Sequence, residues 1–371
     1  MILDRTTLPP MDVAGRADRL RGLLADAGAD ALLVTSLTNV RYLTGFTGSA
    51  ALLLVAPDRL VFVTDGRYRD QSADQLAAAG VQADVEIGRT GEAQREHLAA
   101  AAKGLDRLAL EAEDVTWAQQ QRYAGEWFPD AELVASSGLV EQLRIVKDEG
   151  EVARITAACA IADEALAVVR PRLGKRATEA EIALELEWQM RHLGAEGPSF
   201  ETIVASGPNG AQPHHRAADR RIAEGDLVVI DFGALVDGYH SDMTRTVSVG
   251  GPDATQARML AVVAESQAAG VAAVRAGVEA HEVDAACRRV IEEAGWGDAF
   301  LHGTGHGVGL DIHEPPRVST TPTGKLADGH VVTVEPGVYL PEHGGVRIED
   351  AVVVTPDGCR TLTRAPKDAT L

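Results

Sequence analysis

The sequence predicts an α+β protein of two domains, and three observations lead to this prediction. Its 371 residues are enough for two hydrophobic cores. In residues 1–140, short apolar runs of β type alternate with helical patterns, which is typical of a small α/β domain with a mixed sheet. In residues 141–371, the order of two helices, a loop and an acid-bearing β-hairpin occurs twice. We therefore expect the second domain to contain an internal repeat whose two halves line a shared cleft.

The first domain begins with an amphipathic helical pattern within residues 12–35, followed by the strand sequence ADALLVTS. The stretch YLTGFTGS at residues 42–49 is rich in Gly and Thr and is interpreted as a connecting turn. Further strands are expected at 50–56, 60–64, 108–111 and 132–135, and further helices at 67–79, 92–103 and 116–125.

A long helix over residues 148–170, ending near Pro171, opens the second domain. Thr178 and Glu181 form a capping-box sequence at the start of the next helix, which should stop at Gly194. The repeat then supplies two more helices, from Asp253 to about Gly277 and from there to Gly295.

Two acids mark the first hairpin, LVVIDFGALVDGYHSDMTRT at residues 227–246. Asp237-Gly238 is a strong signature of a two-residue hairpin turn. Asp231 ends an apolar run and Asp242 lies on the returning arm, so their carboxylates can meet across neighbouring strands. Such acids repel each other and are costly to desolvate, which predicts a bound metal.

The second hairpin, residues 331–354, repeats this arrangement with Glu335 and Glu349, which lie symmetrically about the turn at 341–345. Four carboxylates from two hairpins, with one histidine, would form an oxygen-rich site for two metal ions. The one histidine comes from the intervening Gly-rich segment HGTGHGVGLDIHE, which contains three candidates, His302, His306 and His313.

The ligand types favour two divalent ions, Mn²⁺ first and Co²⁺ second, because carboxylates predominate and no thiolate is present. Ligand type alone also admits Zn²⁺ or Fe²⁺. A pair of such ions generates hydroxide at neutral pH and polarises a carbonyl. The sequence therefore predicts hydrolytic chemistry, most naturally on an amide.

The composition of the chain indicates which classes of binding partner to exclude and in which cellular compartment the protein is expected. The formal net charge of −20 argues against a nucleic-acid partner, which requires a basic face. The N-terminus has no secretory signal and the longest apolar runs are too short to span a bilayer, so no membrane partner is expected. Cys159, Cys287 and Cys359 lack metal-type spacing and are interpreted as free thiols in a reducing compartment. These observations predict a cytoplasmic protein.

Three more side chains lie close to the acids or in a nearby loop. His214 and His215 follow a Ser-Gly-Pro-Asn-Gly turn, and a loop histidine of this kind is usually a solvated surface residue. That interpretation is given to His215. Arg347 lies two residues before Glu349 and should face the same side of its strand, where an arginine orients and neutralises buried acids.

The sequence resembles the pita-bread metallopeptidases of the Xaa-Pro aminopeptidase and Xaa-Pro dipeptidase (prolidase) type. The resemblance rests on FETIVASGPNGAQPHH, VVIDFGALVDGYHSDMTRT, HGTGHGVGLDIHEPP, TVEPGVY and GVRIEDAVVV, which cover the chain from about residue 150 to the end. YLTGFTGS and VTDGRY resemble the creatinase-type N-terminal domain less specifically. The resemblance implies a C-terminal pita-bread (creatinase/aminopeptidase) catalytic domain with an internal pseudo-two-fold repeat, preceded by a smaller α/β domain. It also implies a homodimer.

The resemblance assigns a role to each candidate residue. Asp242 and Glu349 would bridge the two ions, and Glu335 would also be the general base or proton shuttle. Arg347 and Tyr339 would support the site. The full set of implied metal ligands is Asp231, Asp242, His306, Glu335 and Glu349, and the histidines that would hold the substrate carbonyl and the tetrahedral intermediate are His214, His302 and His313.

The implied reaction is hydrolysis of the bond between an N-terminal residue and proline in short peptides, as in an Xaa-Pro aminopeptidase, which the TDGRY sequence at residues 64–68 favours. An Xaa-Pro dipeptidase is the alternative. In that case Arg317 would hold the free carboxylate, although the sequence supports a structural salt bridge of Arg317 nearly as well. A creatinase or a non-catalytic peptide-binding module would lack the full ligand set. A methionine aminopeptidase usually lacks an N-terminal domain of this kind.

Overall fold

The computed structural model describes residues 2–371, which form two compact units. The smaller unit is Met11–Arg144. The larger unit is Ile145–Leu371 together with the N-terminal segment that ends at Pro10, which the predicted division had placed in the first domain. The backbone N–H of Leu3 donates to the carbonyl of Leu193 at 2.9 Å, which ties this segment to the larger unit.

The smaller unit contains a mixed sheet with the strand order β4-β3-β2-β1-β5-β6. Strand β1 is parallel to β5 and antiparallel to β2. The sequence prediction missed the edge strand β4 (Asp84–Ile87) and the helix α2 (Leu37–Thr44), which occupies part of the expected turn. The other elements are α1 (Arg16–Leu24), β1 (Ala31–Val34), β2 (Ala51–Val55), β3 (Leu60–Thr64), α3 (Arg69–Ala78), α4 (Gly91–Ala101), β5 (Arg107–Glu111), α5 (Trp117–Arg122), β6 (Glu132–Ser136) and α6 (Leu139–Arg144).

Four helices of the larger unit confirm the predicted repeat of two helix pairs. They are α7 (Glu149–Val169), α8 (Glu179–His192), α9 (Ala254–Ala273) and α10 (Ala280–Glu293). Thr178 caps α8, and its side chain accepts from the backbone of Glu181 while the Glu181 side chain accepts from the backbone of Thr178. This is the capping box that the sequence predicts.

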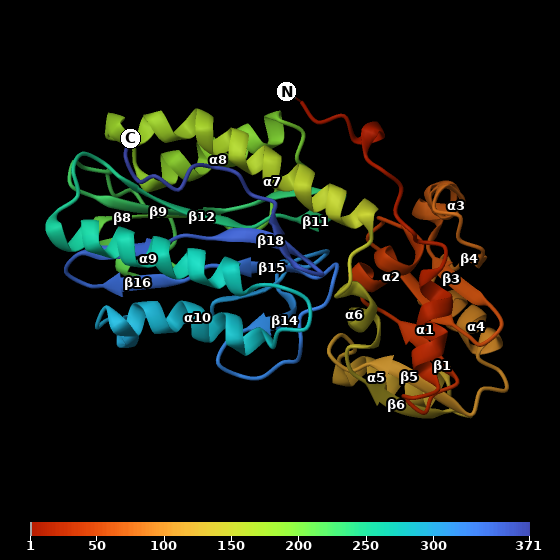
Figure 1. The fold of residues 1–371 in the computed structure, drawn as a ribbon. Helices are drawn as coiled ribbons and strands as arrows, with labels where there is room; N and C mark the ends of the chain where they lie inside the picture. Colours follow the sequence, from red (N-terminus) through yellow and green to blue (C-terminus); the bar gives the residue numbers. More distant parts are fainter. Residues whose placement is uncertain (1) are drawn as a thin grey trace. The chain divides into compact units, whose positions relative to one another are not determined.

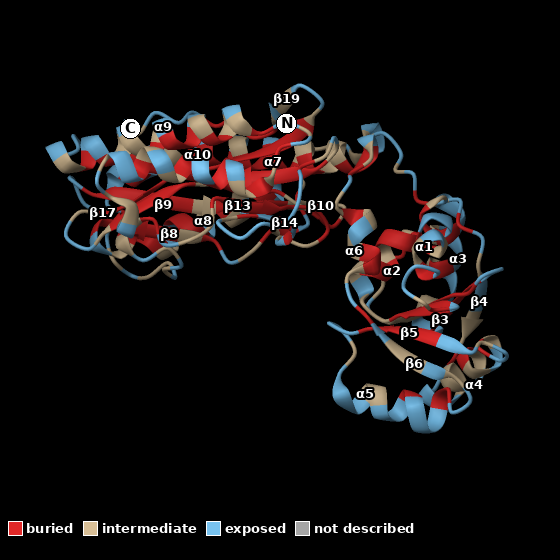
Figure 2. Ribbon diagram, turned by 60° about the horizontal axis from the view of Figure 1, so that its bottom comes forward, coloured by how far each residue is buried: buried red, intermediate tan, exposed pale blue. Residues whose placement is uncertain are grey.

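Each helix pair packs on the strands of its own half of the repeat, α7 and α8 near β8, β9 and β12, and α9 and α10 near β15 and β18 (Figure 1). One apolar core joins α7 and α8 to residues such as Val228 and Ile230, and a second joins α9 and α10 to residues such as Val332 and Val352. The central strands are almost entirely buried (Figure 2).

The strands of the larger unit belong to four small sheets. Their bounds are β7 (Gly197–Pro198), β8 (Ile203–Ser206), β9 (Leu227–Phe232), β10 (Ala234–Val236), β11 (Tyr239–His240), β12 (Met243–Ser248), β13 (Gly305–Gly307), β14 (Glu314–Val318), β15 (Val331–Val334), β16 (Gly337–Leu340), β17 (Gly344–Arg347), β18 (Asp350–Thr355) and β19 (Gly358–Thr361). The strand orders are β12-β9-β8, β14-β13-β15-β18-β19, β11-β10-β7 and β16-β17.

The first acid-bearing hairpin bends in its middle. Strands β9 and β12 pair with Asp231 opposite Thr244, and the chain then continues into the β10–β11 hairpin, where Val236 pairs with Tyr239. Asp237 and Gly238 have φ values of 46° and 72°. Two positive φ angles are the requirement of a type I′ turn, so this part of the sequence prediction is confirmed.

The second hairpin keeps one register over its whole length. Val334 pairs with Asp350 at the end of β15–β18, and Gly337 pairs with Arg347 at the start of β16–β17. Glu335 directly follows Val334 and Glu349 directly precedes Asp350. The two glutamates therefore face each other at the break between the two ladders.

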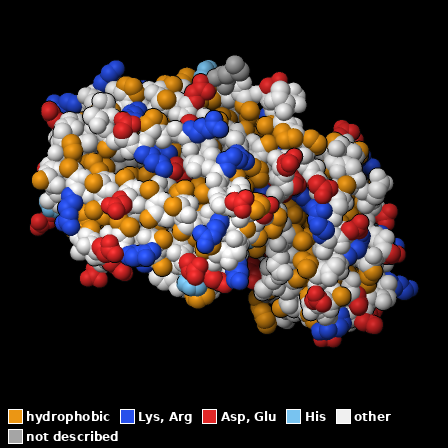
Figure 3. Space-filling model, viewed as in Figure 1, with side chains coloured by type: hydrophobic (Ala, Val, Ile, Leu, Met, Phe, Trp, Pro, Cys, Tyr) orange, Lys and Arg blue, Asp and Glu red, His pale blue; other side chains and the backbone are white. Residues whose placement is uncertain are grey.

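No helix within the described residues is both long and apolar enough to cross a membrane. On the face drawn in Figure 3, acidic side chains alternate with Lys and Arg instead of forming one area of a single charge. The excess of acidic residues is thus spread among basic ones on this face.

Candidate metal centre

Four acids and one histidine that the sequence singles out lie on the central strands or directly beside them. Asp231 is the fifth residue of β9, and Asp242 directly precedes β12. Because Asp231 pairs with Thr244, Asp242 is its diagonal neighbour across the ladder, which leaves both carboxylates on one face. His306 is the central residue of β13. Glu335 and Glu349 come from the second hairpin.

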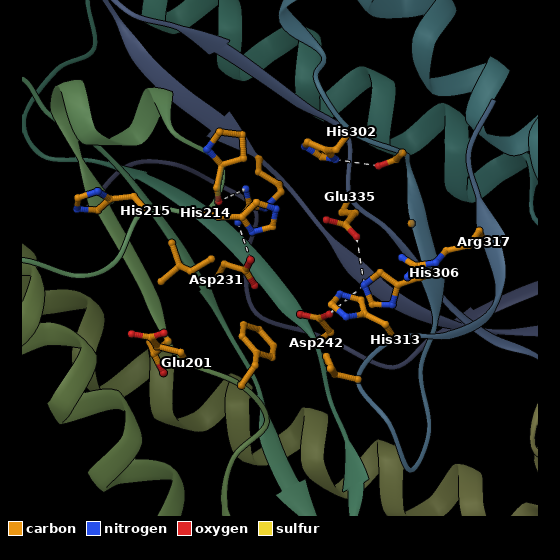
Figure 4. A pocket seen from close by; sticks show the side chains of 18 of the residues that line it. Glu201, His214, His215, Asp231, Asp242, His302, His306, His313, Arg317 and Glu335 are labelled. Atoms are coloured by element: carbon orange, nitrogen blue, oxygen red, sulfur yellow. Dashed lines mark hydrogen bonds and ion pairs between the residues drawn. The ribbon is translucent and has the colours of Figure 1, made fainter. Parts of the chain in front are cut away.

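The carboxylates converge although they are far apart in the sequence. One oxygen each from Asp231, Asp242 and Glu349 lies within 4.8 Å of the other two. The Nε2 atom of His306 is 3.4 Å from Oδ2 of Asp242 and 3.4 Å from Oε1 of Glu335. Figure 4 shows Asp242, Glu335 and the His306 ring pointing toward one another.

Two buried oxygen atoms of this cluster have no hydrogen-bond partner among the described residues, namely Oδ1 of Asp231 and Oε1 of Glu349. Burial raises the pKa of Asp242 and of Glu349 well above the usual range, and repulsion from the neighbouring acids adds to both shifts. Buried carboxylates that repel one another are costly unless they take up protons or a cation lies between them, and a cation also supplies a partner for the two unpaired oxygens. The residues present therefore fit a site for divalent metal ions.

Threonines hold two of these acids in place. Oγ1 of Thr244 donates to Oε2 of Glu349 at 2.8 Å, and Oγ1 of Thr333 donates to Oε1 of Glu335 at 3.2 Å. The sequence analysis did not name either threonine. The signal was present, because Thr244 is two residues from Asp242 and Thr333 is two residues from Glu335, and strand neighbours at this spacing share a face.

Arg347 connects both halves of the repeat, and its side chain is almost fully buried. Its Nη2 donates to Oδ2 of Asp231 at 2.5 Å, and its Nε donates to Oγ1 of Thr244 at 2.9 Å. Its Nη1 donates to the hydroxyl of Tyr339 at 2.8 Å, and that hydroxyl lies 2.8 Å from Nε2 of His302. Arg347 and Tyr339 thus form a hydrogen-bonded link from an acid of the first half to a histidine of the second.

Two histidines beside the acids have lowered proton affinity. Burial lowers the pKa of His302 to about 4, and Arg347 contributes to the shift. Burial also lowers the pKa of His313 to about 4, with a contribution from His306, whose ring centre lies 4.4 Å away. Both imidazoles are therefore neutral at pH 7, and each offers one N–H donor and one acceptor nitrogen.

A cavity of about 630 Å³ opens directly over the acids. Of the candidate residues, Glu349 and Tyr339 do not line it and lie behind the others. The candidate residues in its wall are Asp231, Asp242, His306, Glu335, His214, His302, His313, Arg347 and Arg317. His215 also lines it, together with apolar side chains that the sequence analysis did not name, among them Phe200, Ile203 and Ile312.

The prediction for His215 is wrong. Its side chain is only 14% exposed, and Nε2 lies 2.9 Å from Oε2 of the fully buried Glu179. In Figure 4 its ring points away from the metal-site carboxylates, whereas that of His214 points toward them. No local pattern indicates this contact, because the two residues are 36 positions apart.

Two family models match the chain. The model of metallopeptidase family M24 matches residues 153–356 and so contains all the clustered acids. The model of the creatinase/prolidase N-terminal domain matches residues 16–146.

Individual proteins are similar over nearly the whole chain. The uncharacterized peptidase YqhT of Bacillus subtilis is 42% identical over 355 residues, which are 95% of this chain and 99% of that protein. The solved structure of an Xaa-Pro dipeptidase from Bacillus anthracis has a TM-score of 0.92 at 38% identity and covers 96% of this chain and 99% of its own. The solved structure of an X-Pro aminopeptidase from Thermotoga maritima has a TM-score of 0.87 at 35% identity. The match covers 95% of this chain and 100% of that one.

Proposed function

Because the chain belongs to metallopeptidase family M24 and has the corresponding pita-bread fold, we propose that it hydrolyses the bond between an N-terminal residue and proline in short peptides. The observation that carries this proposal is the pair of unpartnered buried carboxylate oxygens beneath a cavity with neutral histidines in its wall. The similar dipeptidase and aminopeptidase structures support the same reaction on a prolyl bond.

The residues that would hold the metal ions are Asp231, Asp242, His306, Glu335 and Glu349. We propose Mn²⁺ as the native ion and Co²⁺ as a substitute, because hard oxygen ligands predominate in this set. When bound, a pair of such ions supplies an activated water and polarises a carbonyl. Metal analysis of the purified protein, with recovery of activity after removal and replacement, tests the identity of the ion.

The other wall residues would act directly on the substrate. Glu335 would accept a proton at its carboxylate during attack and return it to the leaving nitrogen of proline. His313 is a neutral donor at pH 7 and would hold the carbonyl oxygen as negative charge develops on it. His302 would join it only after a change of partners, because its Nδ1–H donates to the Gly303 carbonyl at 2.8 Å and its Nε2 is bonded to the Tyr339 hydroxyl at 2.8 Å. His214, in the loop that follows Pro213, would take part in the same role. Arg347 and Tyr339 would keep Asp231 and His302 in place.

Xaa-Pro bonds are expected to be hydrolysed at least tenfold faster, by kcat/KM, than matched Xaa-Ala bonds. The apolar side chains Phe200, Ile203 and Ile312 offer a surface for the rigid proline ring. Alanine would bring an amide N–H into this region, and a stranded N–H costs roughly 1–3 kcal/mol, whereas a factor of ten corresponds to about 1.4 kcal/mol. The measurement compares Ala-Pro with Ala-Ala. Equal kcat/KM values would refute the prolyl assignment and leave a general metallopeptidase.

Of the two forms of the proposal, the geometry favours the dipeptidase. Arg317 lines the cavity and is exposed, and it makes no ion pair with any residue in the described part of the chain. The structural salt bridge considered for it is thus absent there, and its guanidinium is available to a free substrate carboxylate. Arg216, also in the wall, is already 3.3 Å from Glu201.

We expect Arg317→Met to lower kcat/KM for Ala-Pro by roughly 10- to 150-fold, which corresponds to the 1.5–3 kcal/mol of a hydrogen bond to a charged group. Ala-Pro-amide, which lacks the carboxylate, should be hydrolysed equally by the variant and the wild-type protein. Arg216→Met is the matched control and should affect both substrates alike. If Arg317→Met leaves the rate on Ala-Pro unchanged, the arginine does not hold the carboxylate.

The Xaa-Pro aminopeptidase remains the second candidate, because the similar Thermotoga maritima structure has that specificity in its name. It requires space for a chain beyond proline. Wild-type kcat/KM values for Ala-Pro and Ala-Pro-Ala distinguish the two forms directly, since an aminopeptidase would prefer the tripeptide.

A further inference from the structure

Glu179, the first residue of helix α8, is fully buried and accepts hydrogen bonds on both carboxylate oxygens. Oε1 accepts from the backbone N–H of Ser206 at 2.7 Å, from its hydroxyl at 2.6 Å and from Nδ2 of Asn209 at 3.0 Å. Oε2 accepts from Nδ2 of Asn209 at 3.1 Å, from the Ala218 N–H at 3.2 Å and lies 2.9 Å from Nε2 of His215. No lone pair of this carboxylate is left for another function.

These partners flank His214 on both sides. Ser206 and Asn209 precede it in the chain, and His215 and Ala218 follow it. Both ends of the segment 206–218 therefore meet on one carboxylate, which closes the segment into a compact loop with His214 facing the cavity (Figure 4).

The loop also contacts the metal centre. Its Pro213 carbonyl accepts a hydrogen bond from Nη1 of Arg347 at 3.3 Å. At Gly210 an added Cβ would lie 3.1 Å from the backbone nitrogen of Gly345, so the loop packs closely against β17. A shift of the loop would consequently move His214 relative to the acids that Arg347 holds.

We propose that Glu179 is a positioning residue of the hydrolytic reaction, which acts by fixing the loop 206–218 and hence the place of His214 over the scissile carbonyl. This inference rests on the proposed function. Glu179 itself does not line the cavity and touches no reacting atom. Errors of about 1 Å in the placement of a group in an active site can lower the rate by roughly 100-fold, so a remote residue of this kind can control turnover.

The first variant is Glu179→Gln. In either orientation its amide NH₂ faces N–H donors of the loop and cannot accept from them, so at least two hydrogen bonds are lost. We expect kcat on Ala-Pro to fall at least tenfold, with unchanged metal content. Glu181→Gln is the matched control two positions along the same helix. The side-chain oxygen of a glutamine at position 181 still accepts from the Thr178 N–H and completes the capping box, so kcat should not change.

A double-mutant cycle distinguishes positioning of His214 from a general structural role. If Glu179 acts through His214, adding Glu179→Gln to His214→Ala should lower kcat no further than His214→Ala alone. Independent effects that multiply would overturn the proposal. Loss of metal from Glu179→Gln would overturn it as well, because the effect would then pass through the metal centre.

Amide hydrogen exchange gives a readout that does not depend on activity. Exchange in a peptide covering 206–218 should be faster in Glu179→Gln than in the wild-type protein, while peptides from β9 and β18 stay equally protected. If the protein hydrolyses no prolyl peptide, the proposed function fails but this local result still tests the loop. Should Glu179→Gln not fold, Asn209→Ala removes one loop donor and must show the same faster local exchange and a lower kcat. Unchanged exchange and unchanged kcat would refute the inference.

Discussion

An Asp242→Asn variant is expected to lose hydrolytic activity to the background rate, because Asp242 lies at the centre of the cluster. Its carboxylate is within 4.8 Å of ligand atoms of both Asp231 and Glu349, and 3.4 Å from His306. Asparagine has the same shape but no charge, and one of its two oxygen ligands is lost. Glu349→Ala should have the same effect. The measurement is kcat on Ala-Pro together with the metal content of the purified variant.

The same substitution should not destabilise the metal-free protein. Because the pKa of Asp242 is raised in the folded state, its contribution to stability is fully present below its unfolded pKa of about 3.9 and is lost as the pH rises through the folded value. At pH 7 this acid therefore opposes folding, whether it stays ionised or takes up a proton, and asparagine removes that cost. We expect the metal-free variant to melt at the same or a higher temperature than metal-free wild-type protein.

Added Mn²⁺ should raise the melting temperature of the wild-type protein and have little effect on that of Asp242→Asn. Asp237→Asn serves as the control, because Asp237 occupies the tight turn of the same hairpin and asparagine adopts its positive φ readily. This control should keep both activity and the response to Mn²⁺. Full turnover by Asp242→Asn, or by a metal-free preparation, would contradict the assignment of the cluster.

Glu335→Gln should lower kcat by about 10²–10⁴-fold, which is the usual contribution of a general base. Burial raises the pKa of Glu335, which brings a carboxylate closer to the range in which it can take up a proton and release it again. Glutamine keeps one oxygen near His306 and Thr333 but has no proton-accepting carboxylate. The fold should survive, because Glu335 is joined to Thr304 through its backbone N–H at 2.7 Å.

The decisive measurement for Glu335→Gln is kcat at confirmed metal occupancy. Glu342→Gln, at the exposed end of the same hairpin, is the matched control and should be fully active. A Glu335→Gln protein that binds the ions and keeps most of its turnover would remove Glu335 from the chemistry.

Local patterns in the sequence predicted the elements that depend on neighbouring residues. The Asp237-Gly238 turn, the capping box at Thr178 and the repeat of helix pairs are present in the structure. Elements that depend on distant packing were missed. Strand β4 has only two apolar residues and is a strand because it pairs with β3, and α2 is a short helix buried against the sheet. The prediction for His215 failed for the same reason, since its partner Glu179 lies on another element.

The sequence alone determined which acids face one another within each hairpin, because register and the two-residue period of a strand follow from local spacing. Only the tertiary structure brought the two hairpins together. The backbone N–H of Glu349 donates to the carbonyl of Thr244 at 3.1 Å, and Arg347 reaches Asp231 across 116 positions of the chain. Contacts of this kind arise where the strands of the two halves, each packed on its own core, meet, and no local periodicity encodes them. For the same reason, the hydrogen bonds from the loop that carries His214 to Glu179 can be identified only in the folded structure.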